Sequence, residues 1–318
     1  MNAAGGAAGA CGGLIVSEVR FDDRVAIVTG AGGGLGRTYA LMLASRGAAV
    51  VVNDLGGASD GTGGSSSMAD AVVKEITDAG GKAVSNYDSV ATPEGGENIT
   101  KTAVDNFGRV DIVVNNAGIL RDKTFAKLEP QNLEAVLDVH LKGAFFVTQP
   151  AFRQMKENNY GRIVFAASGA GVFGNFGQTN YGAAKMGLVG LSNVLSIEGA
   201  KNNIKSNVIT PVAKTRLTEE LMAQFPIDLS PEYVTPLVAY LCSEECELTH
   251  EIFDVGAGHY ARIFIGLTEG WTAPAGGPPS LEQLRDNFET VRDTASYDIP
   301  SSIAGETKSM IEAVQKRG

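Results

Sequence analysis

Short apolar runs alternate with helical patterns from residue 24 onward, and this alternation constrains the fold more than any other feature of the sequence. "RVAIVTG" at 24–30 is rich in β-branched residues and ends at glycine, "GLGRTYALMLASRG" at 34–47 has helical periodicity, and "AAVVVND" at 48–54 is apolar again. A strand, a helix and a second strand in this order are typical of a βαβ unit. The sequence therefore predicts two parallel strands joined by a helix.

The alternation continues through most of the chain. Helices are expected over 67–79, 94–107 and 131–157, around residue 181 and in the stretch from Leu217 to Cys242, and strands at 82–88, 110–118, 161–168, 204–210 and 251–255. Near-continuous apolar strands of this kind are buried on both sides of a sheet. We therefore predict an α/β fold with a doubly wound parallel sheet of about seven strands and helices on both faces.

Composition shifts divide the chain into three parts. Residues 1–19 are rich in glycine and alanine and are interpreted as a flexible leader, and residues 20–260 form the predicted domain. Residues 261–318 are a C-terminal extension with the stretch "TAPAGGPPS" and an amphipathic helix over 281–294. Such a helix needs a surface on which to lie, so the extension is interpreted as an appendage of the domain.

The overall charge and composition exclude several classes of protein. Among 318 residues, 26 are basic and 36 acidic, and this balance of −10 opposes binding to nucleic acid or to acidic membrane surfaces. We see no run near the ~18 apolar residues that span a bilayer and no secretory signal pattern, so we expect a cytoplasmic protein. Cys11, Cys242 and Cys246 are an odd set without close histidines, which indicates inert thiols and no metal site.

A glycine-rich turn, "VTGAGGGLG", joins the first predicted strand to the first helix. Backbone amides at a helix N-terminus can bind a pyrophosphate. Gly30 can take the turn, Gly34 lets phosphates approach the backbone, and Gly36 permits close packing of helix and strand. Together with Leu35 they form a predicted dinucleotide-binding turn, although such turns also close ordinary βα junctions.

Acidic residues at the ends of the next two strands indicate which dinucleotide is bound. Asp54 follows Gly36 by 18 residues, near the spacing at which a carboxylate binds the adenosine ribose hydroxyls. Its charge would repel a 2′-phosphate, so NAD is favoured over NADP. Asp88 and Ser89, just after the third strand, are expected at the adenine edge. The alternatives are that Asp54 only caps a turn and that the other two are ordinary polar loop residues.

Tyr181 and Lys185 lie four residues apart in "YGAAK", with only glycine and alanine between them. On a helix they share one face, and the ammonium favours the phenolate form of a phenol whose pKa is ordinarily ~10. Ser168 ends a strand 13 residues earlier, where a hydroxyl can hold a substrate oxygen. This set predicts acid–base chemistry on an alcohol beside a nicotinamide. The alternative for an isolated match is a surface tyrosine beside a surface lysine.

These motifs, with "NNAG" at 115–118, resemble those of the short-chain dehydrogenase/reductase family over roughly residues 20–260. The resemblance implies one Rossmann-type domain, a nicotinamide cofactor, and a homodimer or homotetramer. Carried over by position, it makes Tyr181 the acid/base, has Ser168 orient the substrate, and has Lys185 bind the nicotinamide ribose and lower the pKa of the phenol. It also implies that Asn116, Ala117 and Gly118 line the cofactor and that Thr215 reaches the carboxamide.

Several longer stretches, among them "NNAGILRDKTF", "GNFGQTNY" and "FDVGAG", are similar to the (3R)-hydroxyacyl-CoA dehydrogenase unit of peroxisomal multifunctional enzyme type 2. This resemblance implies oxidation of a D-3-hydroxyacyl-CoA by NAD. His140 stands where the broad family commonly has a catalytic asparagine, so it is a candidate for holding a relay water, with a structural histidine as the alternative. "PVAKT" also departs from the family's Pro-Gly. Candidate cations for the CoA phosphates are Arg121, Lys123, Lys127, Lys214 and Arg216.

Two rival functions stay open on the sequence. The same branch is associated with oxidation of 17β-hydroxysteroids, which would need the same catalytic residues. A protein of another class, a non-catalytic NAD-sensing module, would keep the glycine turn without turnover. The intact set of Ser168, Tyr181 and Lys185 favours an enzyme.

Overall fold

Eight strands form one sheet at the centre of the computed structural model, which describes residues 17–216, 218–219 and 224–316. Their order is β3-β2-β1-β4-β5-β6-β7-β8, and all neighbours run parallel except β7 and β8. The strands are β1 Val25–Thr29, β2 Ala49–Asn53, β3 Lys82–Asn86, β4 Ile112–Asn115, β5 Gly161–Ala166, β6 Ile204–Pro211, β7 Ile252–Gly256 and β8 His259–Ile263. The predicted α/β fold with a doubly wound, Rossmann-type sheet is confirmed.

The sheet has one strand more than the seven expected, because the chain reverses after β7. Ala257 and Gly258 both have positive φ, 50° and 78°, as in the two-residue turns that suit the twist of antiparallel hairpins. The reversal adds β8 as an antiparallel edge strand. An alanine in a left-handed conformation is uncommon, so the sequence carries no strong turn signal at this point.

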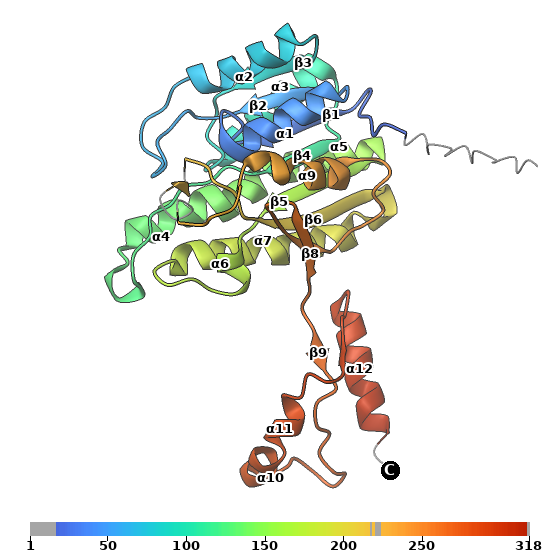
Figure 1. Ribbon diagram of the computed structural model, residues 1–318. Helices are drawn as coiled ribbons and strands as arrows, with labels where there is room; N and C mark the ends of the chain where they lie inside the picture. The colour runs from blue at the N-terminus through green and yellow to red at the C-terminus, as the bar shows by residue number, and fades with distance from the viewer. Residues whose placement is uncertain (1–16, 217, 220–223, 317–318) are drawn as a thin grey trace, which may run out of the picture.

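Helices cover both faces of the sheet (Figure 1). The apolar residues of α1, α2 and α9 pack in one cluster with the sheet, and those of α3, α5 and α7 pack in a second cluster on the opposite face. These helices are α1 Gly34–Ser45, α2 Ser67–Asp78, α3 Pro93–Phe107, α5 Gly143–Asn158, α7 Thr179–Glu198 and α9 Thr235–Cys242. The helix-rich stretch expected from Leu217 to Cys242 is described only in part, because residues 217 and 220–223 lie outside the described residues.

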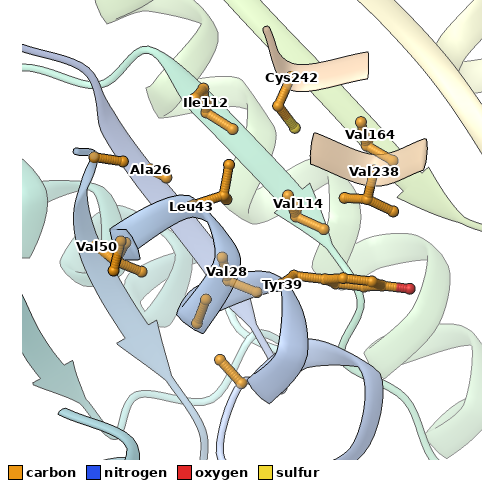
Figure 2. Packing of buried hydrophobic residues seen from close by; sticks show 14 of the residues in the cluster. Ala26, Val28, Tyr39, Leu43, Val50, Ile112, Val114, Val164, Val238 and Cys242 are labelled. Atoms are coloured by element: carbon orange, nitrogen blue, oxygen red, sulfur yellow. The ribbon is translucent and has the colours of Figure 1, made fainter. Parts of the chain in front are cut away.

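Alternation along β1 shows how one strand serves both layers: Ala26 and Val28 face α1, whereas Val25 and Ile27 belong to the opposite cluster. Figure 2 shows side chains of α1 and α9 lying over the strands, and the thiol of Cys242 is part of this cluster. Each fully buried valine or isoleucine stabilises the fold by about 1.5–3 kcal/mol relative to an exposed one. Cys242 and Cys246 are free and buried, and Cys11 lies outside the described residues.

The long helix expected over 131–157 is interrupted. It consists of α4 Pro130–Leu137, one π-helical turn at Asp138–Lys142, and α5. A π turn inserts one extra residue into the helix, and such turns are frequent at functional sites. Here the insertion carries His140, whose side chain is buried.

Residues 264–316 form an arm that projects away from the sheet beyond β8 (Figure 1). It contains β9 Leu267–Thr268 paired with β10 Tyr297–Asp298, and the helices α10 Leu281–Asp286, α11 Phe288–Val291 and α12 Ile303–Gln315. The single helix predicted over 281–294 is wrong, because α10 ends at Asp286 and the backbone of its C-cap residue, Asn287, leaves the helical region at φ −106° and ψ 7°. None of the three arm helices has a buried residue.

Candidate active site

A cleft of about 490 Å³ opens at the carboxyl ends of the strands, where β1 and β4 lie side by side and the strand order reverses. In open α/β sheets, ligands bind at such a reversal. Most of the residues predicted to bind the cofactor line this cleft, namely Gly30, Gly34, Leu35, Asp54, Asp88, Ser89, Asn116, Ala117, Gly118 and Thr215. The structure therefore brings together at one site residues that are up to 185 positions apart in the sequence.

The glycine turn opens the N-terminus of α1 toward the cleft. Gly30 and Gly34 have positive φ, 63° and 52°, a backbone conformation that favours glycine. A Cβ on Gly36 would overlap the carbonyl oxygen of Gly30, so the third glycine is needed for close packing of α1 on the turn. The N-cap of α1, Gly33, makes no side-chain capping bond. The free amides of the first turn and the helix dipole together suit a phosphate group.

Asp54 lies at the end of β2 with its carboxylate in the glycine turn. Its Oδ2 accepts a hydrogen bond from the Gly32 amide at 2.8 Å, and its Oδ1 accepts one from the Gly56 amide at 2.7 Å. Asp54 therefore caps the turn, and the same carboxylate also lines the cleft. Arg37, the cation that follows the turn on α1, binds both carboxylate oxygens of Glu75.

The "NNAG" segment joins β4 to β1 at the floor of the cleft. The Asn116 side-chain amide donates to the carbonyls of Thr29 at 3.0 Å and Gly30 at 3.2 Å. The backbone amides of Asn116 and Ala117 both donate to the Thr29 hydroxyl. These bonds fix the spacing between the glycine turn and the segment predicted to line the cofactor.

Lys185 and Tyr181 project from the first turns of α7 toward the end of β5. The Lys185 ammonium is buried, donates to the Ala166 carbonyl at 2.5 Å, and lies 5.4 Å from the centre of the Tyr181 ring. Ser168 is the N-cap of α6 Gly169–Val172, and its hydroxyl accepts from the Ala170 amide at 3.2 Å. The predicted serine, tyrosine and lysine thus converge although they come from two different elements.

Burial controls the ionisation of this set. It raises the pKa of Tyr181 to about 12, and a side-chain hydrogen bond with Ser168 acts in the opposite direction. Burial also lowers the pKa of Lys185 to about 7. The chain's own groups therefore leave the phenol a weaker acid than free tyrosine, because burial outweighs the stabilisation of the phenolate that was expected from Lys185.

His140 lies beside Tyr181 and Lys185. Its Nε2 is 3.0 Å from the Ile119 amide nitrogen and 2.8 Å from the Ile119 carbonyl oxygen, whereas its buried Nδ1 makes no bond within the described residues. Burial, followed by the nearby charge of Lys185, keeps its pKa well below 6.5. A cavity of about 10 Å³ borders His140, Lys185 and Asn115, which is close to the space that one water occupies.

A feature that sequence reasoning missed is the loop over 55–66, which we call the strap. It lines the cleft through Leu55, Gly57, Ala58 and Gly61. Arg121 Nε donates to the Asp60 carbonyl at 2.9 Å, and Arg216 donates to the Gly57 carbonyl at 3.0 Å. Arg121 and Arg216, two of the candidate cations for the CoA phosphates, therefore hold the strap through its backbone carbonyls. The glycine-rich sequence "LGGASDGTGGSS" was the available signal for a loop closely approaching a ligand.

Three further observations complete the description of the site. The methyl group of Thr215 lies beside Gly34, near the glycine turn. Within the described ranges, no cluster of histidine, cysteine or carboxylate side chains is arranged to hold a metal ion. No helix in the same ranges is long and apolar enough to cross a membrane.

Comparisons with known proteins agree with this geometry. A family model described as short chain dehydrogenase matches residues 24–225. A short-chain type dehydrogenase/reductase of Mycobacterium tuberculosis is 54% identical over 87% of this chain and 96% of its own length. Peroxisomal multifunctional enzyme type 2 of Mus musculus is 49% identical over 95% of this chain, which spans only 41% of the mouse protein.

A solved structure extends the comparison to the fold. Full-length peroxisomal multifunctional enzyme type 2 of Drosophila melanogaster superposes with a TM-score of 0.78 and 41% identity. The match covers 94% of this chain and 50% of the fly chain. The family model, the identities and the arrangement of the cleft lead to one conclusion: the chain belongs to the short-chain dehydrogenase family and is an oxidoreductase.

Proposed function

We propose that the protein oxidises a (3R)-hydroxyacyl-CoA to the 3-ketoacyl-CoA and reduces NAD. The observation that carries this proposal is the convergence of Ser168, Tyr181 and Lys185 beside a cleft with a phosphate-binding glycine turn. The likeness to peroxisomal multifunctional enzymes supports the choice of a hydroxyacyl thioester as substrate.

In the proposed mechanism, the Ser168 hydroxyl donates a hydrogen bond to the substrate oxygen and holds it near the phenol oxygen of Tyr181. The Tyr181 phenolate accepts the hydroxyl proton while the hydride leaves the substrate's C3 carbon. When bound, oxidised nicotinamide supplies the hydride acceptor and a positive charge that favours the phenolate. Lys185 would bind the nicotinamide ribose, and its ammonium, when protonated, would add a second positive charge.

His140 has a proposed supporting role in the same reaction. The small cavity beside Lys185 has room for one water, and the unpartnered Nδ1 of His140 can bond such a water. A water there would link the buried lysine to the histidine and give the proton from Tyr181 a way out of the site. The π turn at Asp138–Lys142 is what places this ring inside the domain.

NAD is the proposed cofactor because of the charge at the end of β2. Asp54 is held by two backbone amides at the position predicted for the adenosine ribose. Its carboxylate can accept hydrogen bonds from ribose hydroxyls and would repel a 2′-phosphate. Arg37, which could otherwise bind that phosphate, is engaged by Glu75.

The proposal is tested by following NADH formation with graded D- and L-3-hydroxyacyl-CoA esters, with a 17β-hydroxysteroid in parallel. We expect turnover of the D esters with NAD, and at least tenfold lower kcat/KM with NADP and with the L esters. Preferential turnover of the steroid would assign the rival dehydrogenase function. Binding of NAD without turnover of any substrate would support the non-catalytic alternative.

We also propose that the protein is a homodimer or homotetramer in which the arm lies on a second copy. The arm exposes apolar side chains on every helix, including Leu281, Phe288 and Ile303, which are 77%, 51% and 82% exposed. The N-termini of two of its helices are capped by side chains: Ser280 and Gln283 form a capping box at α10, and Ser302 caps α12. Solution scattering at micromolar concentration should give a multiple of the chain's mass, and a strictly monomeric species would contradict the proposal.

A further inference from the structure

The carboxylate of Asp88, at the predicted adenine edge of the cleft, is held on both of its oxygens. Asn86 Nδ2 donates to Oδ2 at 2.8 Å, and Asn98 Nδ2 donates to Oδ1 at 3.1 Å. Asp88 also lines the cleft. Two donors on opposite oxygens fix the plane of a carboxylate, whereas a single donor would leave it free to rotate.

The orientation of the Asn86 amide is determined by its neighbours. Its Oδ1 accepts from Asn53 Nδ2 at 2.8 Å and from the Asp88 backbone amide at 3.0 Å, so its NH₂ group must face Asp88 Oδ2. Asn53 also donates to the Asp88 carbonyl at 2.9 Å. Asn53 and Asn86 are buried at the ends of β2 and β3, so this half of the clamp is built into the sheet.

Asn98 supplies the other half of the clamp from α3. This helix is anchored beside the Asp88 loop, because Thr92 caps its first turn and Gly95 approaches the Ser89 carbonyl so closely that a Cβ would overlap it. The Asn98 side chain is exposed, and its own removal would leave no buried cavity. Nothing in packing alone requires an asparagine at this position.

We propose that Asn98 is a positioning residue for adenine selection. It holds the Asp88 carboxylate, against Asn86, in the plane where it accepts a hydrogen bond from the N6 amino group of adenine. The inference rests on the proposed binding of NAD. A purine with a carbonyl at position 6 would place an acceptor against the fixed carboxylate, so the clamp would disfavour it.

The test measures binding, without catalysis, by titration calorimetry of the full-length protein. The ligands are NAD and nicotinamide hypoxanthine dinucleotide, in which a carbonyl replaces the adenine amino group. We expect Asn98→Ala to weaken NAD binding roughly 5- to 10-fold and to change binding of the hypoxanthine dinucleotide less than about twofold. Asn106→Ala is the matched control, because Asn106 is exposed on the same helix and bonds only its own helix, at the Thr102 carbonyl.

Two further variants distinguish positioning from a general loosening of α3. Asn98→Asp places a like charge beside Asp88 and should lower NAD affinity more than Asn98→Ala does. In an Asp88→Ala background, Asn98→Ala should have no further effect, since no carboxylate remains to be held. Equal loss for both dinucleotides, or an undiminished effect in the Asp88→Ala background, would overturn the inference.

The outcomes also separate this inference from the proposed function. If the wild-type protein binds neither dinucleotide, the proposed NAD-dependent function fails, and with it the inference. If the wild type binds NAD and Asp88→Ala alone loses selectivity, the function stands and only the role of Asn98 is refuted.

Discussion

The imidazole of His140 meets the ring of Tyr181 edge to face, with centroids 5.1 Å apart and ring planes at 89°. On its other side, the imidazole fills the space that a side chain at Gly118 would occupy, since a Cβ there would overlap His140 Cε1. The imidazole of His140 therefore packs between Gly118 of the "NNAG" segment and the ring of Tyr181.

Gly118→Ala tests this packing. The new methyl group must push the buried ring aside, so we expect a loss of about 1–3 kcal/mol in the free energy of unfolding, together with reduced turnover. In a His140→Ala background the imidazole ring is absent, so Gly118→Ala should lower the free energy of unfolding by less than about 0.5 kcal/mol. Urea unfolding of the four proteins in the cycle measures both numbers. The same cost in both backgrounds would show that the ring is not what Gly118 accommodates.

Because of Lys185, the free energy of unfolding should increase with pH above about pH 7. Burial lowers its pKa to about 7 in the folded protein, against ~10.4 in the unfolded chain, so between these values the unfolded state binds more protons. The stability of the folded protein therefore rises with pH across this window. From pH 7 to pH 9 the free energy of unfolding should increase by roughly 2 kcal/mol more in the wild type than in Lys185→Met.

Urea unfolding of both proteins at pH 7, 8 and 9 checks this prediction. Lys205→Met is a suitable control, because Lys205 is paired with the exposed Glu247 and its loss should leave the wild-type pH trend in place. If the free energy of unfolding changed equally with pH in the wild type and in Lys185→Met, the lysine would not be buried as described.

Asp54→Asn separates the charge of this residue from its structural role. The amide keeps the shape of the side chain and one oxygen acceptor for the Gly32 or Gly56 amide, so stability should change by less than about 1 kcal/mol. Loss of the negative charge should reduce the preference for NAD over NADP by roughly 10- to 100-fold. Steady-state kcat/KM values with both cofactors give this ratio, and an unchanged ratio would remove Asp54 from cofactor selection.

The sheet and the cleft were predictable because burial on both faces leaves near-continuous apolar strands, and because the polar residues that follow them must gather at one edge. Asp54 and Ser168 were found in this way, whereas Asn116 came from the family resemblance. The π turn at His140 was not predictable, since one inserted residue barely disturbs helical periodicity. The strap was not predicted, because the hydrogen bonds from Arg121 and Arg216 to its carbonyls join segments that are far apart in the sequence.

The ionisation of the site was also beyond the sequence. Spacing placed Lys185 on the same helix face as Tyr181, and the structure confirms that neighbourhood. Spacing cannot show how deeply the two groups are buried, and burial raises the pKa of the phenol while it lowers that of the lysine. The balance between desolvation and attraction is a property of the folded protein alone.

The most direct test of the proposed chemistry compares wild type with Tyr181→Phe in single-turnover reduction of NAD by a D-3-hydroxyacyl-CoA. Removing one oxygen atom leaves the packing against His140 intact, so NAD affinity measured in parallel should change less than about threefold. The rate should fall by at least about 10³-fold, because the group that accepts the alcohol proton is gone. A phenylalanine variant that forms NADH at the wild-type rate would contradict the assignment of Tyr181 as the catalytic base.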